Sequence, residues 1–287
     1  MTINLETTKY ITKHTCTSEY GDLKKVIVCS PTHMSISEVI NETQKHYVND
    51  NIDETIALKQ HRNFVNAMLA NGIEVYSLPP SEQYPEQVFT RDIGFTLGET
   101  IFVSHMGSTI RSGEEDVLKS WLDERNSSYK PLSGNSVEGG DVIIDRDTVY
   151  VGISDRTSPE GLNHIKKALQ DHQVVPIPIE KSYLHLDCVF NVISPTEALI
   201  FSPALRKAEI DLLSQRYELI EVNKEEQFTM GTNVLSIGNK KIFSLPCNKN
   251  VNKQLRKRGY EVIEVDISEI IKSGGSFRCC TLPLLRK

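Results

Sequence analysis

The sequence lacks the features that mark several large protein classes, and each absence narrows the function. No apolar run approaches the roughly 18 residues that a membrane-spanning helix needs, and the N-terminal residues lack the basic-then-apolar order of a secretory signal. The formal charge is -6 at pH 7, whereas a protein that binds a nucleic-acid backbone presents a basic face. We therefore expect a cytoplasmic protein whose partners include neither a membrane nor a nucleic acid.

Motifs for common cofactors are also missing. The six cysteines, at positions 16, 29, 188, 247, 279 and 280, include no Cys-x-x-Cys pair, and none of the eight histidines forms His-x-x-x-His. Neither a Gly-x-x-x-x-Gly-Lys phosphate loop nor a Gly-x-Gly-x-x-Gly fingerprint occurs. These absences predict a protein with no metal and no other cofactor, whose cysteines are free thiols.

A repeat organises the chain, which is otherwise of ordinary globular composition. Four segments begin alike at Asp92, Asp141, Asp187 and Asn233, and Cys279 falls where the next unit should begin. Each segment has two β-rich runs separated by a turn signal, then a helix signal, then a third β-rich run. The repeating unit is therefore predicted to be strand, strand, helix, strand.

Capping signals indicate where the helices start and stop. Ser112-Gly-Glu-Glu115 has the pattern of a capping box, and Ser158-Pro159 and Ser202-Pro203 each place a cap residue before proline at the first helical position. In the last repeat, Asn248 is the candidate cap and Gly259 the candidate stop.

The two ends of the chain together supply a fifth unit. The N-terminal part contributes strands over 23–29 and 73–78 with a helix between them, and the C-terminal part contributes a strand from Cys280 onward. Closure by the two ends would protect the edges that an incomplete array exposes. We therefore predict an α/β fold of five pseudo-symmetric ββαβ units, a propeller-like ring closed by the N- and C-terminal strands, with residues 1–287 as a single domain.

In such a ring, equivalent positions of the units face a common centre, so residues far apart in sequence converge. These positions and their neighbours carry Asp92, Glu138, Asp141, His185, Asp187, Asn233 and Cys279. A thiol, an imidazole and carboxylates suit nucleophilic catalysis on a cationic electrophile, and carboxylates match the forked donors of a guanidinium. A small guanidino substrate is therefore predicted, and its positive charge would lower the pKa of the Cys279 thiol.

Four motifs resemble those of the guanidine-modifying superfamily, which includes arginine deiminases, dimethylarginine dimethylaminohydrolases and amidinotransferases. They are Phe89-Thr-Arg-Asp92, Glu138-Gly-Gly-Asp141, His185-Leu-Asp187 and Gly274-Gly-Ser-Phe-Arg-Cys279-Cys-Thr-Leu-Pro, in the family's order. The resemblance spans most of the chain and implies the five-unit propeller known as the pentein fold, in agreement with the repeat.

The resemblance also implies the roles of the catalytic groups. Cys279 would attack the guanidinium carbon, His185 would protonate the departing amine and later activate water, and Glu138 with Asp92 would hold the guanidinium. The products would be citrulline and ammonia or a methylated amine.

Further substrate contacts follow from the same resemblance. It implies that Asp187 is another carboxylate for the guanidinium, that Phe89 contacts the substrate, and that Arg111 and Arg156 bind its α-carboxylate. Two neighbours are assigned structural roles instead. Cys280 should face away from its neighbour Cys279 by strand alternation, and Asp141 should bond to nearby backbone.

The subfamilies differ at positions that leave the reaction open. Methylarginine hydrolases usually have Glu at the position of Arg91 and Lys at that of Asp187, so both positions look more like an arginine deiminase, whereas the chain length resembles the methylarginine hydrolases. We predict a hydrolase of arginine or an N-methylated arginine. The alternatives are an amidinotransferase, which passes the amidino group to an amine, and a noncatalytic ring-shaped binding protein. A homodimer is left open.

Overall fold

The computed structural model describes residues 13–287 and has a mixed α/β fold with five three-stranded sheets. The strands are β1 (Leu23–Cys29), β2 (Glu74–Leu78), β3 (Gly94–Leu97), β4 (Thr100–Val103), β5 (Tyr129–Pro131), β6 (Val142–Asp145), β7 (Thr148–Ile153), β8 (Gln173–Pro178), β9 (Phe190–Val192), β10 (Glu197–Ile200), β11 (Glu218–Glu221), β12 (Leu235–Ser236), β13 (Lys241–Ser244), β14 (Glu261–Glu264) and β15 (Leu282–Arg286). The helices are α1 (Glu42–Tyr47), α2 (Glu54–Ala70), α3 (Glu114–Asp123), α4 (Pro159–Ala168), α5 (Lys207–Ser214), α6 (Lys224–Phe228) and α7 (Lys249–Lys257).

Four of the sheets repeat one pattern. In the sheet β6-β7-β8, an antiparallel hairpin pairs Val142 with Val151, and β8 then returns parallel to β7 after helix α4. The sheets β3-β4-β5, β9-β10-β11 and β12-β13-β14 have the same order, with α3, α5 and α7 before their third strands. The predicted order of strand, strand, helix, strand is confirmed for these sheets.

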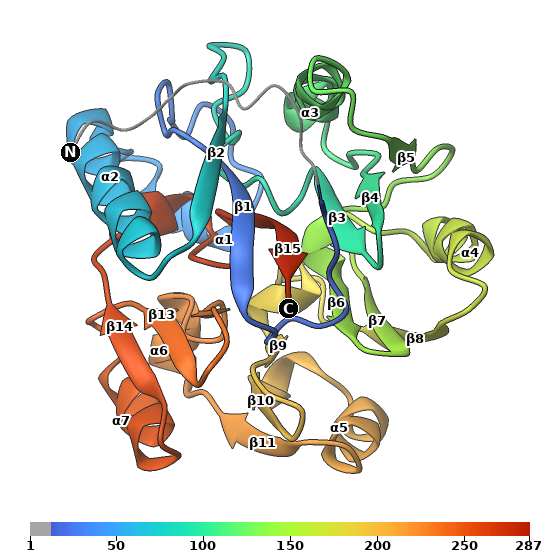
Figure 1. The fold of residues 1–287 in the computed structure, drawn as a ribbon. Coiled ribbons are helices and arrows are strands. Elements are labelled where there is room, and N and C mark those ends of the chain that lie inside the picture. Colours follow the sequence, from blue (N-terminus) through green and yellow to red (C-terminus); the bar gives the residue numbers. More distant parts are fainter. Residues whose placement is uncertain (1–12) are drawn as a thin grey trace.

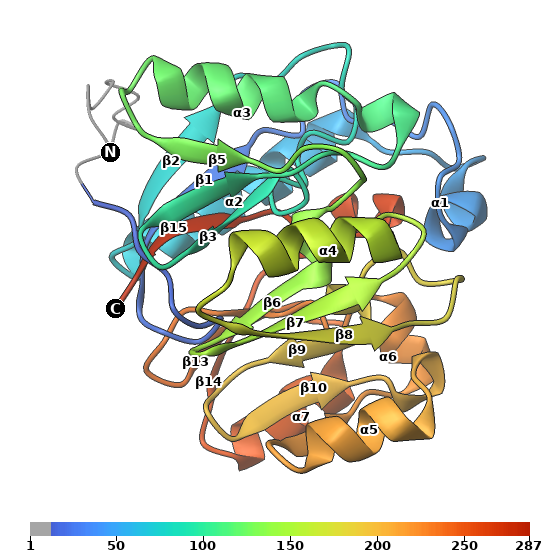
Figure 2. The same cartoon turned by 90° about the vertical axis from the view of Figure 1, so that its right-hand side faces the viewer.

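The fifth sheet joins the two ends of the described chain. Strand β1 pairs antiparallel with β15, with Leu23 opposite Arg286, and parallel with β2, with Lys25 opposite Glu74. Figure 1 shows β15 beside β1, while α2, α3, α4, α5 and α7 lie at the periphery of the view. Figure 2 shows α3, α4 and α5 one above another along one side of the molecule. Within residues 13–287, no helix is both long and apolar enough to cross a bilayer.

The helix starts were predicted with mixed success. At α4 the prediction is confirmed, because Ser158 is the N-cap and its Oγ accepts a hydrogen bond from the Gly161 amide at 3.0 Å. At α3 the cap is Gly113, in the left-handed region at φ 102°, and not Ser112. The glutamate of the predicted capping box still bonds to the cap residue, because Glu115 Oε2 accepts a hydrogen bond from the Gly113 amide at 2.9 Å.

Two other starts differ from the sequence prediction. Ser202-Pro203 begins a short 3-10 turn over 202–204, and α5 starts only at Lys207, because the chain becomes extended at Leu205. Asn248 does precede α7, but its Oδ1 accepts from the Thr229 hydroxyl at 2.5 Å, and its side chain makes no capping bond to the helix. Gly259 follows the end of α7 with φ 82°, as the stop signal predicted.

The segment around Cys279 is a turn, so the prediction that a strand starts at Cys280 is wrong. The Cys280 amide donates to Ser276 O at 2.9 Å, the Thr281 hydroxyl donates to Phe277 O at 3.0 Å, and β15 begins at Leu282. Strand alternation therefore does not separate Cys279 from Cys280. Both are buried in the cluster of apolar side chains under α2.

Aromatic packing fixes this turn to the core. The ring of Phe277 lies 5.0 Å from that of Phe64 on α2 and 6.2 Å from that of Phe243 on β13. Such ring pairs contribute about 0.5–1.5 kcal/mol each beyond the area they bury. Phe277, two residues before Cys279, thus anchors the turn to α2 and to β13.

Candidate active site

Three of the predicted site residues meet at the entrances to first strands. Glu138 and His185 each precede a 3-10 turn, over 139–141 and 186–188, and Asp92 lies two residues before β3. His185 Nε2 lies 2.7 Å from Glu138 Oε2, and His185 Nδ1 lies 3.6 Å from Asp92 Oδ1. All three side chains are at most 2% exposed. Residues from three different repeats therefore lie in contact at this site.

The carboxylates hold His185 as an imidazolium. Burial lowers the pKa of His185, but the charge of Asp92 and the hydrogen bond to Glu138 outweigh burial and raise that pKa to about 10. Burial raises the pKa of Glu138, and the hydrogen bond and charge of His185 more than reverse this, so the Glu138 pKa lies below its usual range. The pair is thus an ionised acid–base couple at neutral pH.

The same three residues could offer ligands to a metal ion. Asp92, Glu138 and His185 each present one donor atom, and these atoms lie within 4.8 Å of one another. A metal requires the neutral form of histidine, whereas the two carboxylates stabilise the protonated ring. The charge state of His185 therefore works against metal binding, and the expectation of a metal-free enzyme stays a prediction.

Cys279 lies against a different carboxylate. Its Sγ is 3.5 Å from Asp187 Oδ2, which also accepts from Arg278 Nη1 at 2.5 Å. The Cys279 amide donates to Asn233 Oδ1 at 3.1 Å, and Asn233 Nδ2 donates to Asp187 O at 3.2 Å. Within residues 13–287, no hydrogen bond joins Cys279 to His185.

The thiol of Cys279 is neutral in this environment. Contact with Cys188, burial and the charge of Asp187 all raise the pKa of Cys279 well above its ordinary value. A positive charge beside the thiol would lower this pKa, which is the effect that the sequence analysis expects of a cationic substrate.

Asp92 has one oxygen that accepts a hydrogen bond and one that accepts none from the described residues, although the second lies 3.6 Å from His185 Nδ1. Arg111 Nη1 donates to Asp92 Oδ2 at 2.5 Å, while Arg111 also donates to Glu114 at 2.8 Å and to Phe89 O at 3.3 Å. Oδ1 is buried and has no hydrogen-bond partner among residues 13–287. A buried carboxylate oxygen without a donor is costly, so this oxygen marks a place where a cationic donor would bind favourably.

The other predicted substrate contacts lie near this group. The ring of Phe89 packs so closely on Gly275 that a Cβ added to Gly275 would lie 2.4 Å from it and 3.1 Å from Cys279 Cβ. Arg156 is 8% exposed, and its Nη2 donates to Ile40 O at 3.1 Å. The charge of Arg156 also contributes to the lowered pKa of Glu138, after the larger effects of His185 and Arg111.

Asp141 ties two of the turns together. Its Oδ1 accepts from the Leu186 amide at 2.9 Å and its Oδ2 from the Ser154 hydroxyl at 2.7 Å. The prediction of a bond within the local loop is wrong, because the backbone amide that bonds Asp141 is that of Leu186, 45 residues further along the chain in the next repeat. Asp141 therefore couples the Glu138 turn to the His185 turn.

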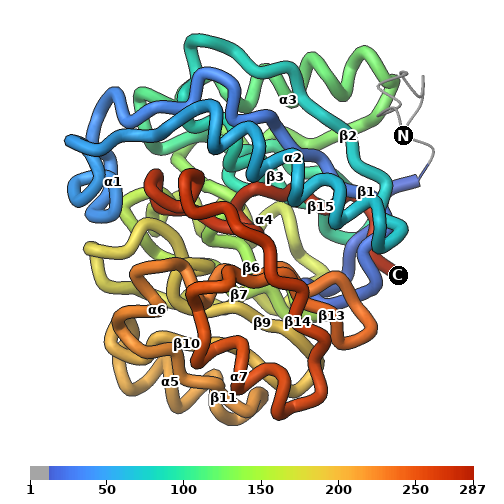
Figure 3. Tube along the Cα trace, turned by 90° about the vertical axis from the view of Figure 1, so that its left-hand side faces the viewer, coloured from blue at the N-terminus to red at the C-terminus, as the bar shows by residue number. Residues whose placement is uncertain are grey.

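Sequence reasoning missed several groups that support the site. Glu114 lies three residues after Arg111 and holds it, which the helical i,i+3 spacing could have indicated. Gln44 on α1 donates to Glu86 Oε1 at 2.7 Å and to Ser273 Oγ at 2.8 Å, and this contact has no signal in a single sequence. Figure 3 shows α1 beside the red segment that contains Ser273 and leads to Cys279.

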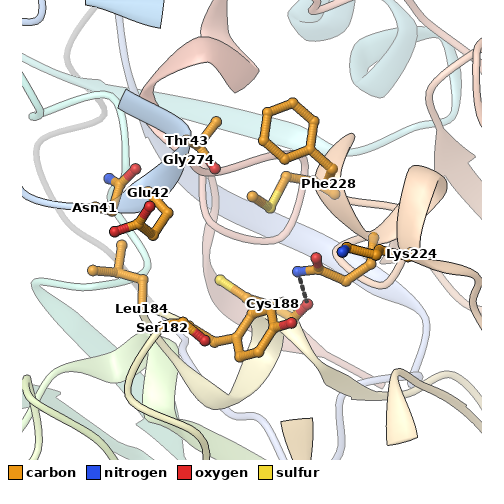
Figure 4. Close-up of a pocket in the computed structure, with 12 residues that line it drawn as sticks. Asn41, Glu42, Thr43, Ser182, Leu184, Cys188, Lys224, Phe228 and Gly274 are labelled. Carbon is orange, nitrogen blue, oxygen red and sulfur yellow. Dashed lines mark hydrogen bonds between the residues drawn. The ribbon is translucent and has the colours of Figure 1, made fainter. Parts of the chain in front are cut away.

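A cavity of about 180 Å³ opens next to the site. Cys188 lines it, and the Cys188 thiol contacts Asp187 Oδ1 at 3.6 Å. Figure 4 shows Cys188 with Glu42 and Leu184 on one side and Lys224 and Phe228 on the other. Cys188 therefore stands between this cavity and the carboxylate that contacts Cys279.

Comparisons with known proteins agree with the geometry. A family model described as N,N dimethylarginine dimethylhydrolase, eukaryotic, matches residues 30–286. The uncharacterized protein YkgA of Bacillus subtilis is 55% identical over 274 residues, with 96% of each chain covered. The N(G),N(G)-dimethylarginine dimethylaminohydrolase of Mycobacterium tuberculosis is 26% identical, with 91% of this chain and 86% of that chain covered.

A solved structure shows the same fold. The N-terminal domain of ArgZ bound to product, an arginine dihydrolase from the ornithine-ammonia cycle in cyanobacteria, superposes with a TM-score of 0.84 at 24% identity. The match covers 92% of this chain and 98% of that domain.

Proposed function

Because the chain belongs to the N,N dimethylarginine dimethylhydrolase family, within the guanidine-modifying superfamily, we propose that it hydrolyses a guanidino carbon–nitrogen bond of arginine or an N-methylated arginine. The observation that carries this proposal is the free, buried Oδ1 of Asp92 beside the His185–Glu138 pair. A guanidinium supplies N–H donors, and this oxygen has no hydrogen-bond donor among residues 13–287.

In the first half-reaction the substrate activates its own nucleophile. A guanidinium on Asp92 places a cation near Cys279, which lowers the thiol pKa, and the thiol proton leaves to solvent. The Cys279 thiolate then forms a bond to the guanidinium carbon. As the bond from that carbon to the departing nitrogen breaks, the His185 imidazolium gives its proton to the leaving ammonia or methylated amine.

In the second half-reaction the same histidine works in the opposite direction. Neutral His185 takes a proton from water, the resulting hydroxide adds to the amidino carbon, and the bond to Cys279 sulfur breaks. Citrulline is released as its hydroxyl proton passes to the departing sulfur, so the neutral Cys279 thiol is restored and His185 is again an imidazolium beside Glu138. Asp187, held by Arg278, lies against the thiol and is proposed to complete the carboxylate frame for the guanidinium.

We further propose that the five sheets close into a pentein ring formed by one domain over residues 1–287, which the pairing of β1 with β15 supports. The cavity lined by Cys188 is proposed to be the substrate's entrance, because the Cys188 thiol contacts Asp187, the carboxylate against which Cys279 lies.

The proposal is tested by the products formed from a panel of guanidines. The full chain would be incubated separately with arginine, N-monomethylarginine and asymmetric dimethylarginine, and citrulline, ammonia, methylamine and dimethylamine would be quantified. We expect citrulline with one matching amine in equal amounts from at least one substrate. If the amidino group passed to added glycine or ornithine without citrulline, the protein would be an amidinotransferase. No turnover of any guanidine, with or without an acceptor, would support a binding protein.

Arg156 gives a test of how the substrate is held. If it binds the α-carboxylate, Arg156→Gln should raise KM for arginine about 10- to 100-fold, because a charge-assisted pair contributes roughly 1.5–3 kcal/mol. Agmatine, which lacks the carboxylate, serves as the internal control. Its kcat/KM should be similar in both proteins, and an equal loss for both substrates would contradict a carboxylate contact. The same role stays a prediction for Arg111, whose guanidinium is already paired with Asp92 and Glu114.

A further inference from the structure

A second group of buried charges adjoins Asp187, and the reaction proposed above does not use most of it. It consists of Glu19, Arg91, Asp187, Arg278 and Arg286, all at most 5% exposed, and is called here the arginine cluster. Arg278 links its two carboxylates, with Nη1 2.5 Å from Asp187 Oδ2 and Nη2 3.1 Å from Glu19 Oε1. Arg91 Nη2 lies 3.5 Å from the other oxygen of Glu19.

The charges of the arginine cluster do not balance. Arg91 and Arg278 pair with the carboxylates of Glu19 and Asp187, and the charge of Arg286 also acts on Glu19, so three guanidinium groups and two carboxylates leave one positive charge in excess. The nearby Cys16 thiol does not supply the missing charge, because burial raises its pKa to about 12 and keeps it neutral. Asp22 influences Arg286, but its side chain is 34% exposed and is paired with Lys24 at 2.7 Å. An uncompensated charge in a buried site is strongly unfavourable.

The hydrogen bonds of the cluster are incomplete as well. The side chain of Arg91 makes no hydrogen bond with any of residues 13–287, and its Nε and Nη2 are buried. Arg278 Nε and Arg286 Nη2 are also buried without a partner in that part of the chain. By contrast, Arg111 donates to Asp92, Glu114 and Phe89 O. Unpaired donors on three arginines of one cluster point to a missing acceptor.

We propose that the arginine cluster binds one monovalent inorganic anion of the chloride class, held by Arg91 and Arg286 with Arg278. A single negative charge matches the single excess positive charge, and a spherical acceptor can receive several N–H donors at once. A phosphate or another dianion fits less well, because Glu19 and Asp187 would repel its second charge. Burial and the mutual repulsion of the arginines lower the pKa of Arg91 to about 10, which agrees with an undercompensated positive charge.

The anion would influence the proposed active site through one residue. Asp187 Oδ2 contacts both Arg278 and the Cys279 thiol. A negative charge bound beside Arg278 would therefore change the electrostatic potential at the carboxylate that contacts the proposed nucleophile. The binding site itself does not depend on the proposed reaction and can be tested without any substrate.

Bromide replacement tests the site on the unaltered chain. Crystals grown without chloride and soaked in sodium bromide should show an anomalous peak within hydrogen-bond distance of Arg91 and Arg286. Thermal unfolding should show a saturable rise in Tm with chloride that gluconate at equal ionic strength does not reproduce. The rise should reach about 4 °C at a hundredfold excess over the dissociation constant. Water alone at this position, together with equal Tm in both salts, would overturn the proposal.

Arg91→Gln tests the assignment of the donors. This variant removes the excess charge, so it should lose the chloride-specific rise in Tm while remaining folded in chloride-free buffer. Arg206→Gln is the matched control, because Arg206 pairs with Glu209 on exposed surface and lies outside the arginine cluster. It should keep the full response to chloride. An unchanged chloride response in Arg91→Gln would contradict the proposal, and the bromide experiment remains decisive if that variant does not fold.

Discussion

Cys279→Ser is expected to lower kcat for the best guanidine of the panel by at least about 10³-fold, because a serine hydroxyl does not ionise near neutral pH. The surroundings of Cys279 give a further reason to expect a large loss of kcat. The Cys279 pKa is already raised by contact with Cys188, by burial and by Asp187, so a cationic substrate must lower it before attack. A hydroxyl in the same place starts from a much higher pKa and gains too little from the substrate's charge. Single-turnover kinetics with intact-mass spectrometry would show the covalent adduct in the unaltered protein and none in the variant.

The neighbouring thiol provides the control. Cys280 lies in the same turn and is equally buried, yet its amide bonds to Ser276 and its side chain belongs to the apolar core. Cys280→Ala should therefore lower stability by about 1 kcal/mol and leave kcat within a few-fold of the unaltered value. If Cys280→Ala abolished the adduct and Cys279→Ser did not, the nucleophile would be the other cysteine. Equal activity in Cys279→Ser and the unaltered protein would remove the covalent mechanism.

The sequence predicted the repeating elements because each repeat is locally consistent. Alternating β-rich runs, turn residues and proline-led helix starts point to the same unit, and β6, β7, α4 and β8 follow that order. Prediction failed where a residue had a competing partner. The Asn248 side chain accepts a hydrogen bond from the hydroxyl of Thr229, 19 residues earlier, and makes no capping bond to α7. The helix expected after Ser202-Pro203 starts later because the backbone becomes extended at Leu205.

The sequence predicted the site as far as the spacing of the repeats shows which positions are equivalent in the fold. Asp92 lies at the repeat position of its unit, and Glu138 and His185 lie just before the repeat positions of theirs, so the spacing predicted that the three would lie near one another. The spacing of the repeats could not show which carboxylate would pair with which arginine or histidine. Arg278 holds Asp187, and Arg111 holds Asp92, through side-chain rotations that the periodicity does not encode. Arg91 lies in the Phe89–Asp92 motif, yet its ion-pair partner Glu19 comes from a segment before the first repeat.

Glu138→Gln is expected to lower kcat by about 10²-fold or more, because it removes the charge and the hydrogen bond that keep His185 protonated. The 2.7 Å contact to Glu138 and the charge of Asp92 raise the His185 pKa to about 10 against the effect of burial. Without Glu138 the His185 pKa should fall, so less imidazolium is available to protonate the leaving amine. The alkaline limb of the kcat profile should therefore move to lower pH in the variant. NMR titration of the His185 ring would measure the shift directly.

Stability should change with pH in a way that distinguishes this pair from a general loss of packing. Since the folded pKa of His185 is raised, its contribution is fully present below its unfolded pKa of about 6.5 and is lost as the pH rises toward 10. Since the folded pKa of Glu138 is lowered, its contribution is present above its unfolded pKa and is lost in acid. Glu138→Gln should therefore be destabilised most near pH 6 and least near pH 10, as measured by urea unfolding. Glu115→Gln, at a buried carboxylate that caps α3, should show no such slope between these values. A Glu138→Gln deficit that stayed constant from pH 6 to pH 10 would show that the carboxylate does not hold the imidazolium.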